Sequence, residues 1–519
     1  MNGAEALLQT LIGCGVEVCF ANPGTSEMQL VAAIDNNPGM RPVLTLFEGV
    51  ATGAADGYGR MAEKPAATLL HLGPGLANGM ANLHNAMRAR SPVINIIGDH
   101  ASYHLNYDAP LTSDLEGHVR LQSDWYRFAK SAQALAADGA AAVQASLNGA
   151  GKIASLVVPA DHSWNPGGEP VSALPKPRRN TVAQGALEDA ARALVSGEPT
   201  ALLLGGSALR AENLDIAGRI AAVSGARLLC ETFPARIQRG AGRVTPERVP
   251  YLGEMAADML KDLKHIILIG SKAPVSFFAY PDQPSWLCPK GAEIYAFAHP
   301  DGDIDTALMA LLDSVSPGQS AAEPVRQQAS LPPVPTGALT AEGIGACVAE
   351  ALPEGAIVSD ESNTCGLSIY PMTSGAAPHD WLSLTGGAIG QGLPVAVGAA
   401  IACPERKVVC LQADGSAMYT LQALWTMARE NLDITTVILN NRSYAILNFE
   451  LYRLGVEQPG PSAASMLNLT NPELDWVQLA QGMGMPASRA TSVEGFRSLY
   501  ANAMASTGPQ LIEAQLGGL

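Results

Sequence analysis

Two polar pairs close two neighbouring apolar runs near the end of the chain. Asp414-Gly415 follows KVVCLQA, and Asn440-Asn441 ends DITTVILNN, with a predicted helix over residues 420–431 between them. A right-handed βαβ crossover returns the second strand parallel to the first, so both exits are expected at one edge of a sheet. A carboxylate, an amide oxygen and a backbone carbonyl suit Mg²⁺ shared with phosphates. The alternative is a helix cap and a turn of the kind that any βαβ unit carries.

A second acidic residue, Glu48, follows the apolar run RPVLTLF and opens the small-residue stretch EGVATGAADGYGRM. A carboxyl group between an apolar strand and a close-packed helix is expected to be buried, and such groups often exchange protons with a ligand. The alternative is an ordinary acidic residue that the helix dipole favours at the N-terminus.

Hydroxyl and imidazole groups occupy two further loops. Thr25 and Ser26 lie in FANPGTSEMQL, where a hydroxyl would either hold a carboxylate or cap a helix. His71 lies in LLHLGPG, and an imidazole is a side-chain group suited to proton transfer, although a histidine at a strand end is often only structural. His104 and His100 are four residues apart, but their flanks lack a helical pattern, so a metal pair is disfavoured.

These residues require a scaffold that brings strand ends together. Short β-rich runs alternate with helical patterns along the whole chain, which predicts an α/β fold of doubly wound parallel sheets. Linker-like stretches at 173–185 and 314–340 divide the chain into predicted domains at about 1–172, 180–315 and 340–519. Ligands of such sheets bind at the carboxyl ends of the strands, where all of these candidates lie.

Composition excludes several functional classes. The chain has 519 residues, of which 47% are hydrophobic, and its net charge is −16, which argues against nucleic-acid binding. No apolar run reaches the length of a membrane span, and the N-terminus lacks a signal-peptide pattern, so a cytoplasmic protein without membrane contact is expected. The eight cysteines contain no CxxC pair and are expected to be reduced.

The spacing of these motifs resembles that of thiamine diphosphate (ThDP)-dependent enzymes. Asp-Gly followed 27 positions later by the second Asn of Asn-Asn is similar to the family's cofactor motif, and the stretch from Glu48 to Arg60 is close to its pyrimidine-domain signature. The resemblance implies that Asp414, Asn441 and the Ser443 carbonyl ligate Mg²⁺. The family usually has glycine where this chain has Ala413, a departure that removes no ligand.

The resemblance also implies a cofactor-binding set drawn from both ends of the chain. In the family the acid that corresponds to Glu48 hydrogen-bonds the aminopyrimidine ring and so activates the cofactor. The Gly387 carbonyl would accept a hydrogen bond from the same ring, and Ile389 would force ThDP into its bent shape. The full set implied is Glu48, Gly73, Asn363, Thr364, Gly387, Ile389, Asp414, Gly415, Ser416, Asn441 and Tyr444.

The loops around the reacting atoms look most like the benzoylformate decarboxylase branch. Thr25 corresponds to that enzyme's active-site serine, with Ser26 beside it, and His71 stands where it has a catalytic histidine. Its second histidine corresponds to Ala279 here, which puts a two-histidine proton relay in doubt. His104 is expected in the substrate pocket, as in some ThDP decarboxylases. The implied catalytic set is Glu48, His71, Thr25, Ser26 and His104.

The resemblance predicts a ThDP- and Mg²⁺-dependent 2-oxo acid decarboxylase that also carboligates. An acetolactate synthase-like carboligase is the alternative, and a non-catalytic ThDP-binding sensor or scaffold is a rival of another class. The middle domain lacks a GxGxxG fingerprint, so no FAD is expected there. In the family the two cofactor domains meet across a subunit interface, which implies at least a homodimer and commonly a homotetramer.

Overall fold

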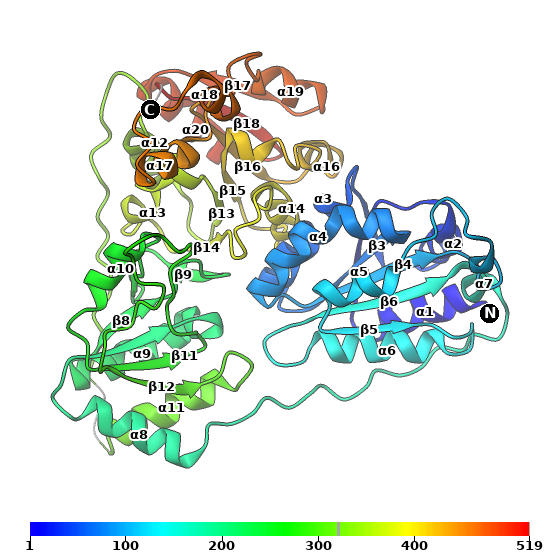
Figure 1. Cartoon of the computed structure of the whole chain (residues 1–519), viewed down its shortest axis with the longest axis horizontal. Coiled ribbons are helices and arrows are strands. Elements are labelled where there is room, and N and C mark those ends of the chain that lie inside the picture. The colour runs from blue at the N-terminus through cyan, green and yellow to red at the C-terminus, as the bar shows by residue number, and fades with distance from the viewer. Residues whose placement is uncertain (319–321, 518–519) are drawn as a thin grey trace.

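Three sheets, each covered by helices on both faces, are arranged side by side in the computed structural model (Figure 1). The structure describes residues 1–318 and 322–517, so residues 319–321 of the predicted second linker and the last two residues lie outside it. All strand pairs but one are parallel, which confirms the predicted α/β class. In the described chain no helix is long and apolar enough to cross a membrane.

The first sheet has six parallel strands in the order β2-β1-β3-β4-β6-β5. Two of its inner strands, VINIIGD and IASLVVP, are buried at every position, as expected for a parallel sheet with helices on both faces. The strands are β1 Val18–Ala21, β2 Arg41–Leu44, β3 Ala66–His71, β4 Val93–Asp99, β5 Trp125–Phe128 and β6 Ile153–Pro159. The helices are α1 Gly3–Gly13, α2 Met28–Asp35, α3 Glu48–Ala62, α4 Leu72–Ala89, α5 Leu115–Gln122, α6 Leu135–Ser146 and α7 Ala160–Trp164, with 3₁₀ turns η1 Thr25–Glu27 and η2 Leu105–Tyr107.

The second sheet has five parallel strands in the order β10-β8-β7-β11-β12. A long extended connection runs to it from the first unit, below both in Figure 1. The strands are β7 Thr200–Leu204, β8 Arg227–Cys230, β10 Glu247–Arg248, β11 His265–Ile269 and β12 Glu293–Ala298. The helices are α8 Gln184–Leu194, α9 Ala211–Ser224, α10 Gly253–Leu260 and α11 Ile304–Val315, with the 3₁₀ turn η3 Gly206–Leu209.

The third sheet has the order β17-β18-β16-β15-β13-β14-β9. Its strands are β9 Ile237–Arg239, β13 Ile357–Glu361, β14 His379–Ser383, β15 Val408–Ala413, β16 Ile434–Asn440, β17 Ala487–Ala490 and β18 Gln510–Gln515. Its helices are α12 Ala341–Ala351, α13 Ile369–Met372, α14 Gly392–Ala402, α15 Asp414–Ala417, α16 Ala423–Arg429, α17 Ala445–Arg453, α18 Pro461–Leu467, α19 Trp476–Gly482 and α20 Val493–Ala505, with the 3₁₀ turn η4 Asn363–Gly366.

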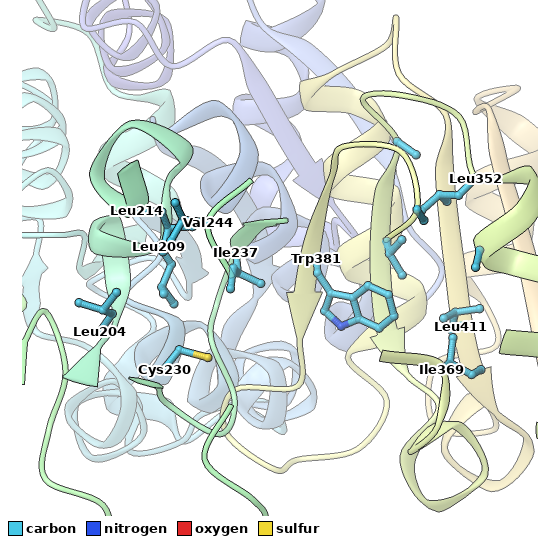
Figure 2. Packing of buried hydrophobic residues seen from close by; sticks show 14 of the residues in the cluster. Leu204, Leu209, Leu214, Cys230, Ile237, Val244, Leu352, Ile369, Trp381 and Leu411 are labelled. Carbon is cyan, nitrogen blue, oxygen red and sulfur yellow. The ribbon is translucent and has the colours of Figure 1, made fainter. Parts of the chain in front are cut away.

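Strand β9 comes from the middle stretch of the sequence yet joins the third sheet, antiparallel to β14. Ile237 lies opposite Trp381 in this pair, and Figure 2 shows both side chains between the core residues of the second and third units. Alternation of apolar runs does not reveal such an exchange, because a three-residue strand carries too little pattern.

The first and third units meet through α3 and α14. A Cβ atom on Gly57 would lie 2.2 Å from the Val395 carbonyl oxygen, and one on Gly398 would lie 1.9 Å from that of Ala54. Both glycines therefore allow the two helix backbones to touch. Because Glu48 opens α3, and α14 follows the glycine-rich run 386–392, this contact brings the two ends of the chain to one region.

Candidate active site

The two polar pairs of β15 and β16 lie together at one edge of the third sheet. The strands are parallel and in register up to Ala413 opposite Leu439. The carboxylate of Asp414 accepts a hydrogen bond of 2.8 Å from the backbone N–H of Arg442, which follows Asn441 directly. The helix predicted over 420–431 is shorter in the structure, where α16 spans Ala423–Arg429 and a separate short helix, α15, begins at Asp414.

The residues at this edge fit a divalent cation. Asp414 is only 1% exposed, and burial raises the pKa of its carboxyl group to about 6. No Lys, Arg or His side chain forms an ion pair with it in the described chain, so the carboxylate lacks the cation that its burial requires. The amide oxygen of Asn441 lies buried beside it and accepts from the Ser443 N–H at 3.1 Å. Ala413 has φ −74° and ψ 145°, which any residue adopts without strain.

Polar groups suited to binding a phosphate lie next to the ends of β15 and β16. The Ser416 hydroxyl accepts from the Gln412 amide at 2.6 Å, and Asn363 Nδ2 approaches the same oxygen at 3.5 Å. Asn363 is exposed and has φ +50°, and Thr364 follows it half-buried on η4. A Cβ on Gly415 would fall 2.5 Å from the ring of Tyr444, so the turn requires glycine there.

A buried acid that the sequence reading missed fixes the glycine-rich loop. Glu361 ends β13, and its carboxylate accepts from the backbone N–H groups of Gly390 at 2.6 Å and Gly392 at 2.5 Å. Burial raises the pKa of Glu361 to about 7. The signal available was an acidic residue at the end of an apolar strand. Gly387, in the same loop, has φ +76°, and Ile389 is half-buried.

Helix α4 holds this loop from the other side. The Asn85 amide donates to the Ala388 carbonyl at 2.7 Å, and its oxygen accepts from the Ala388 N–H at 3.2 Å. The Asn82 amide lies 2.8 Å from the Gly49 carbonyl and 3.3 Å from that of Gly390. The loop is therefore positioned by residues more than 300 positions away, which sequence spacing does not reveal.

Glu48 is the first residue of α3 and is 6% exposed. Its Oε2 accepts a hydrogen bond of 3.0 Å from Asn78 on α4. The expected burial is present. Within the described chain the carboxylate forms no hydrogen bond with the glycine-rich loop or with Asp414, and its pairing with Asp414 across a subunit interface stays a prediction.

His71 belongs to a three-residue cluster that joins two strand ends of the first sheet. Its Nδ1 lies 2.8 Å from Oε2 of Glu27 and 3.2 Å from the hydroxyl of Ser26. The Ser26 hydroxyl also donates to the other carboxylate oxygen of Glu27. Glu27 is fully buried, whereas about a quarter of the His71 side chain, 23%, is exposed. The carboxylate therefore holds the ring through Nδ1 and leaves Nε2 available to a ligand.

Glu27 is the second functional candidate that the sequence reading missed. Its carboxylate also accepts a hydrogen bond of 2.6 Å from the Gly24 N–H. Of the two alternatives for the loop hydroxyls, Thr25 does not cap the helix, because Gly24 is the N-cap and Thr25 is exposed with no side-chain cap bond. Of the two hydroxyls, Ser26 is the one that reaches His71.

The remaining predicted site residues have separate surroundings. His104 is exposed on a turn, where its ring lies 5.5 Å from that of His100 and 5.9 Å from that of Tyr107. No group of three His, Cys, Asp or Glu side chains suited to a metal occurs among the described residues. A Cβ on Gly73 would meet the Ser113 hydroxyl at 2.1 Å, which explains a glycine at the start of α4.

Comparison with known proteins agrees with this geometry. Residues 1–123 match the family described as thiamine pyrophosphate enzyme, N-terminal TPP binding domain, and residues 366–514 match the corresponding C-terminal TPP binding domain. The chain belongs to the thiamine pyrophosphate enzyme family. The predictions of a ThDP-binding protein and of a ThDP-dependent carbon–carbon lyase or carboligase are thereby confirmed.

The similar proteins carry the names of two different activities. A protein of Mycobacterium tuberculosis, provisionally named acetolactate synthase large subunit, is 52% identical over the full length of both chains. Benzoylformate decarboxylase of Pseudomonas aeruginosa is 27% identical over 96% of each chain. Among solved structures, the ThDP-dependent 4-hydroxybenzoylformate decarboxylase of Rhodococcus jostii RHA1 covers both chains fully with a TM-score of 0.87 and 22% identity, which supports the same fold.

Proposed function

We propose that the protein is a ThDP- and Mg²⁺-dependent, non-oxidative decarboxylase of 2-oxo acids that also carboligates. The observation that carries this proposal is the Ser26–Glu27–His71 cluster, a hydroxyl and an oriented imidazole at adjacent strand ends of the first unit. Such a pair suits a substrate that carries a carboxylate and needs a proton during the reaction.

Residues of the third unit would hold the cofactor. Asp414, Asn441 and the Ser443 carbonyl would ligate Mg²⁺, while Asn363 and Ser416 would contact the diphosphate. Bound ThDP supplies a nucleophilic carbon and an electron sink for the loss of CO₂. The protein then contributes position, electrostatics and proton transfer.

Proton transfer falls to Glu48 and His71. Glu48 would hydrogen-bond the aminopyrimidine ring in place of, or together with, its present partner Asn78. His71 would present Nε2 to the reacting carbon's substituents, with its ring fixed by Glu27, and Ser26 would hold the substrate carboxylate. In a simple decarboxylation a proton replaces CO₂ on carbon, whereas in carboligation the proton goes to the carbonyl oxygen of the acceptor, so a proton donor beside the substrate serves both reactions.

An acetolactate synthase-like carboligase remains the second candidate, because the 52% identical relative carries that name. The two reactions are distinguished by their products. Purified protein with ThDP and Mg²⁺ is incubated with pyruvate and with a panel of aliphatic and aromatic 2-oxo acids. Aldehyde as the main product supports the proposal, whereas acetolactate from pyruvate alone overturns it in favour of the carboligase.

A non-catalytic ThDP-binding sensor is tested without any substrate. Exchange of the C2 proton of bound ThDP into deuterated water reports whether the protein activates the cofactor. Exchange faster than that of free ThDP supports an enzyme, and exchange at the free rate supports a sensor or scaffold.

A further inference from the structure

A cavity of about 500 Å³ lies where the three units meet, outside the site described above. Its size is that of a small-molecule pocket. It opens at the carboxyl ends of β7, β8 and β11, beside Gly206, Glu231 and Gly270, and it extends to Thr385 at the start of the glycine-rich loop. In an open parallel sheet this edge, where strand order reverses around β7, is the expected ligand position.

Basic side chains form part of the cavity wall. Arg90 and Lys152 line it, but both pair with Asp301, at 3.3 Å and 3.2 Å. Arg88 and Lys272 also line it and form no ion pair or side-chain hydrogen bond in the described chain. Two cations are therefore available to an anionic ligand.

Three aromatic residues also form part of the wall. Phe233, Tyr251 and Phe277 line the cavity and contact one another, with ring centroids 5.5–6.1 Å apart. Glu231 also lines the cavity, and burial raises the pKa of its carboxyl group to about 7. A carboxyl group with a raised pKa repels an anion less than an ordinary carboxylate does, and its protonated form serves a polar ligand as donor or acceptor.

Two features disfavour a diphosphate here. The first backbone N–H of α9, on Ala211, already donates to the Gln238 side chain at 2.8 Å. The glycines after β7 and β11 are used for mutual packing, because a Cβ on Gly205 would lie 2.6 Å from the Gly270 carbonyl oxygen. One N–H group of the α9 N-terminus and the space beside Gly205 are therefore not available to phosphate groups.

We propose that this cavity binds an aromatic carboxylate, whose ring packs on Phe233, Tyr251 and Phe277 and whose carboxylate pairs with Arg88 and Lys272. Binding would affect the glycine-rich loop through two sets of contacts. Arg88 lies three positions after Asn85 on α4, and the Asn85 side chain is hydrogen-bonded to Ala388. Phe277 packs against Gly387, because a Cβ on Gly387 would lie 2.6 Å from the Phe277 ring. Binding of the aromatic carboxylate does not depend on the proposed function. Only the effect of this coupling on a bound cofactor rests on the proposed function.

Calorimetric titration of the full chain, without added ThDP, tests the site with phenylacetate, an aromatic carboxylate that has no keto group. The wild type and the matched control Lys290→Ala, an exposed lysine of the same unit outside the cavity, are expected to bind one phenylacetate per chain. Lys272→Ala and Arg88→Gln are expected to bind at least ~10-fold more weakly, as loss of a charge-assisted contact predicts. A circular dichroism spectrum confirms that each variant is folded.

Two readouts decide the assignment. Slower backbone hydrogen exchange in residues 385–391 on phenylacetate addition, lost in Lys272→Ala, supports the coupling. Equal affinity in all four proteins, or no saturable binding by the wild type, overturns the proposal. Lys272-dependent binding of ADP that is tighter than that of phenylacetate also overturns it, because the cavity would then be a phosphate site.

Discussion

At the scale of single residues, the structure assigns different tasks to acids that look alike in sequence. Glu48 and Glu27 both stand near a helix start, and both are buried. Glu48 has an amide partner, Asn78, and is 6% exposed, whereas Glu27 is fully buried and bonded to Ser26 and His71. The first is suited to a cofactor and the second to orienting a histidine.

Substitution Glu48→Gln is expected to lower turnover by at least ~10²-fold at saturating ThDP, because the amide cannot exchange the proton that activation requires. Steady-state decarboxylation and C2 proton exchange measure the effect. Glu63→Gln, at the other end of α3, serves as the matched control and should retain activity. Unchanged turnover of Glu48→Gln would refute its role.

His71→Ala is expected to lower kcat by roughly 10²–10⁴-fold, since it removes the proposed proton donor. Glu27→Gln keeps the shape of the side chain but not its charge, so it should reduce kcat less and shift the pH profile of kcat to lower pH. The direction follows because loss of the carboxylate removes stabilisation of the imidazolium form. An unshifted profile in Glu27→Gln would assign Glu27 a purely structural role.

At the scale of elements, the glycine-rich loop is defined by its partners on two other elements. Glu361 at the end of β13 accepts from Gly390 and Gly392, and α4 contributes Asn82 and Asn85. The positive φ of Gly387 and Gly390 is kept by these contacts. The shape of the loop thus depends on side chains from β13 and α4 that hydrogen-bond its backbone.

Glu361→Ala is expected to destabilise the protein by about 2–4 kcal/mol, because two buried N–H groups lose their acceptor. Urea unfolding of the cofactor-free protein measures the change. Glu350→Ala, whose carboxylate pairs with Arg497 at the surface, is the control and should cost less than about 1 kcal/mol. ThDP affinity should also fall in Glu361→Ala. Equal stability of the two variants would contradict the assigned role.

At the scale of the whole molecule, protons and the proposed Mg²⁺ compete for Asp414. The pKa of its carboxyl group is about 6 in the folded chain against an ordinary 3.8, so folding favours the protonated form. The unfolded chain binds fewer protons between these values, and the cofactor-free protein should lose stability as pH rises from about 4 to 6. Glu361, with a pKa of about 7, extends the loss toward neutrality.

Added Mg²⁺ and ThDP should reverse this loss above pH 6, because the ionised carboxylate is the form that binds the metal. Thermal unfolding at pH 5 and pH 7.5, with and without the ligands, is expected to show the larger stabilisation at pH 7.5. Asp414→Asn should remove the difference between the two pH values. An equal shift at both pH values would exclude Asp414 as a ligand.

The proposed pairing of Glu48 with Asp414 of another subunit predicts complementation. Glu48→Gln and Asp414→Asn are each expected to be inactive, but random mixing of their subunits should restore roughly a quarter of wild-type activity. Half of the dimers would be mixed, and one of their two sites would be intact. Activity assays after co-expression, with dimers verified by light scattering, measure this. No recovery in verified mixed dimers would place the site within one chain.

The sequence by itself determined the α/β class and the ThDP-binding motifs, because apolar periodicity and the Asp-Gly and Asn-Asn pairs are local patterns. It also indicated Glu48 and His71, which stand at ends of apolar runs. Only the tertiary structure decided that Ser26 rather than Thr25 meets His71, and that Glu27 and Glu361 orient the two loops. The reason is physical: these contacts join residues on different strands, and their strength depends on burial that spacing along the chain does not encode.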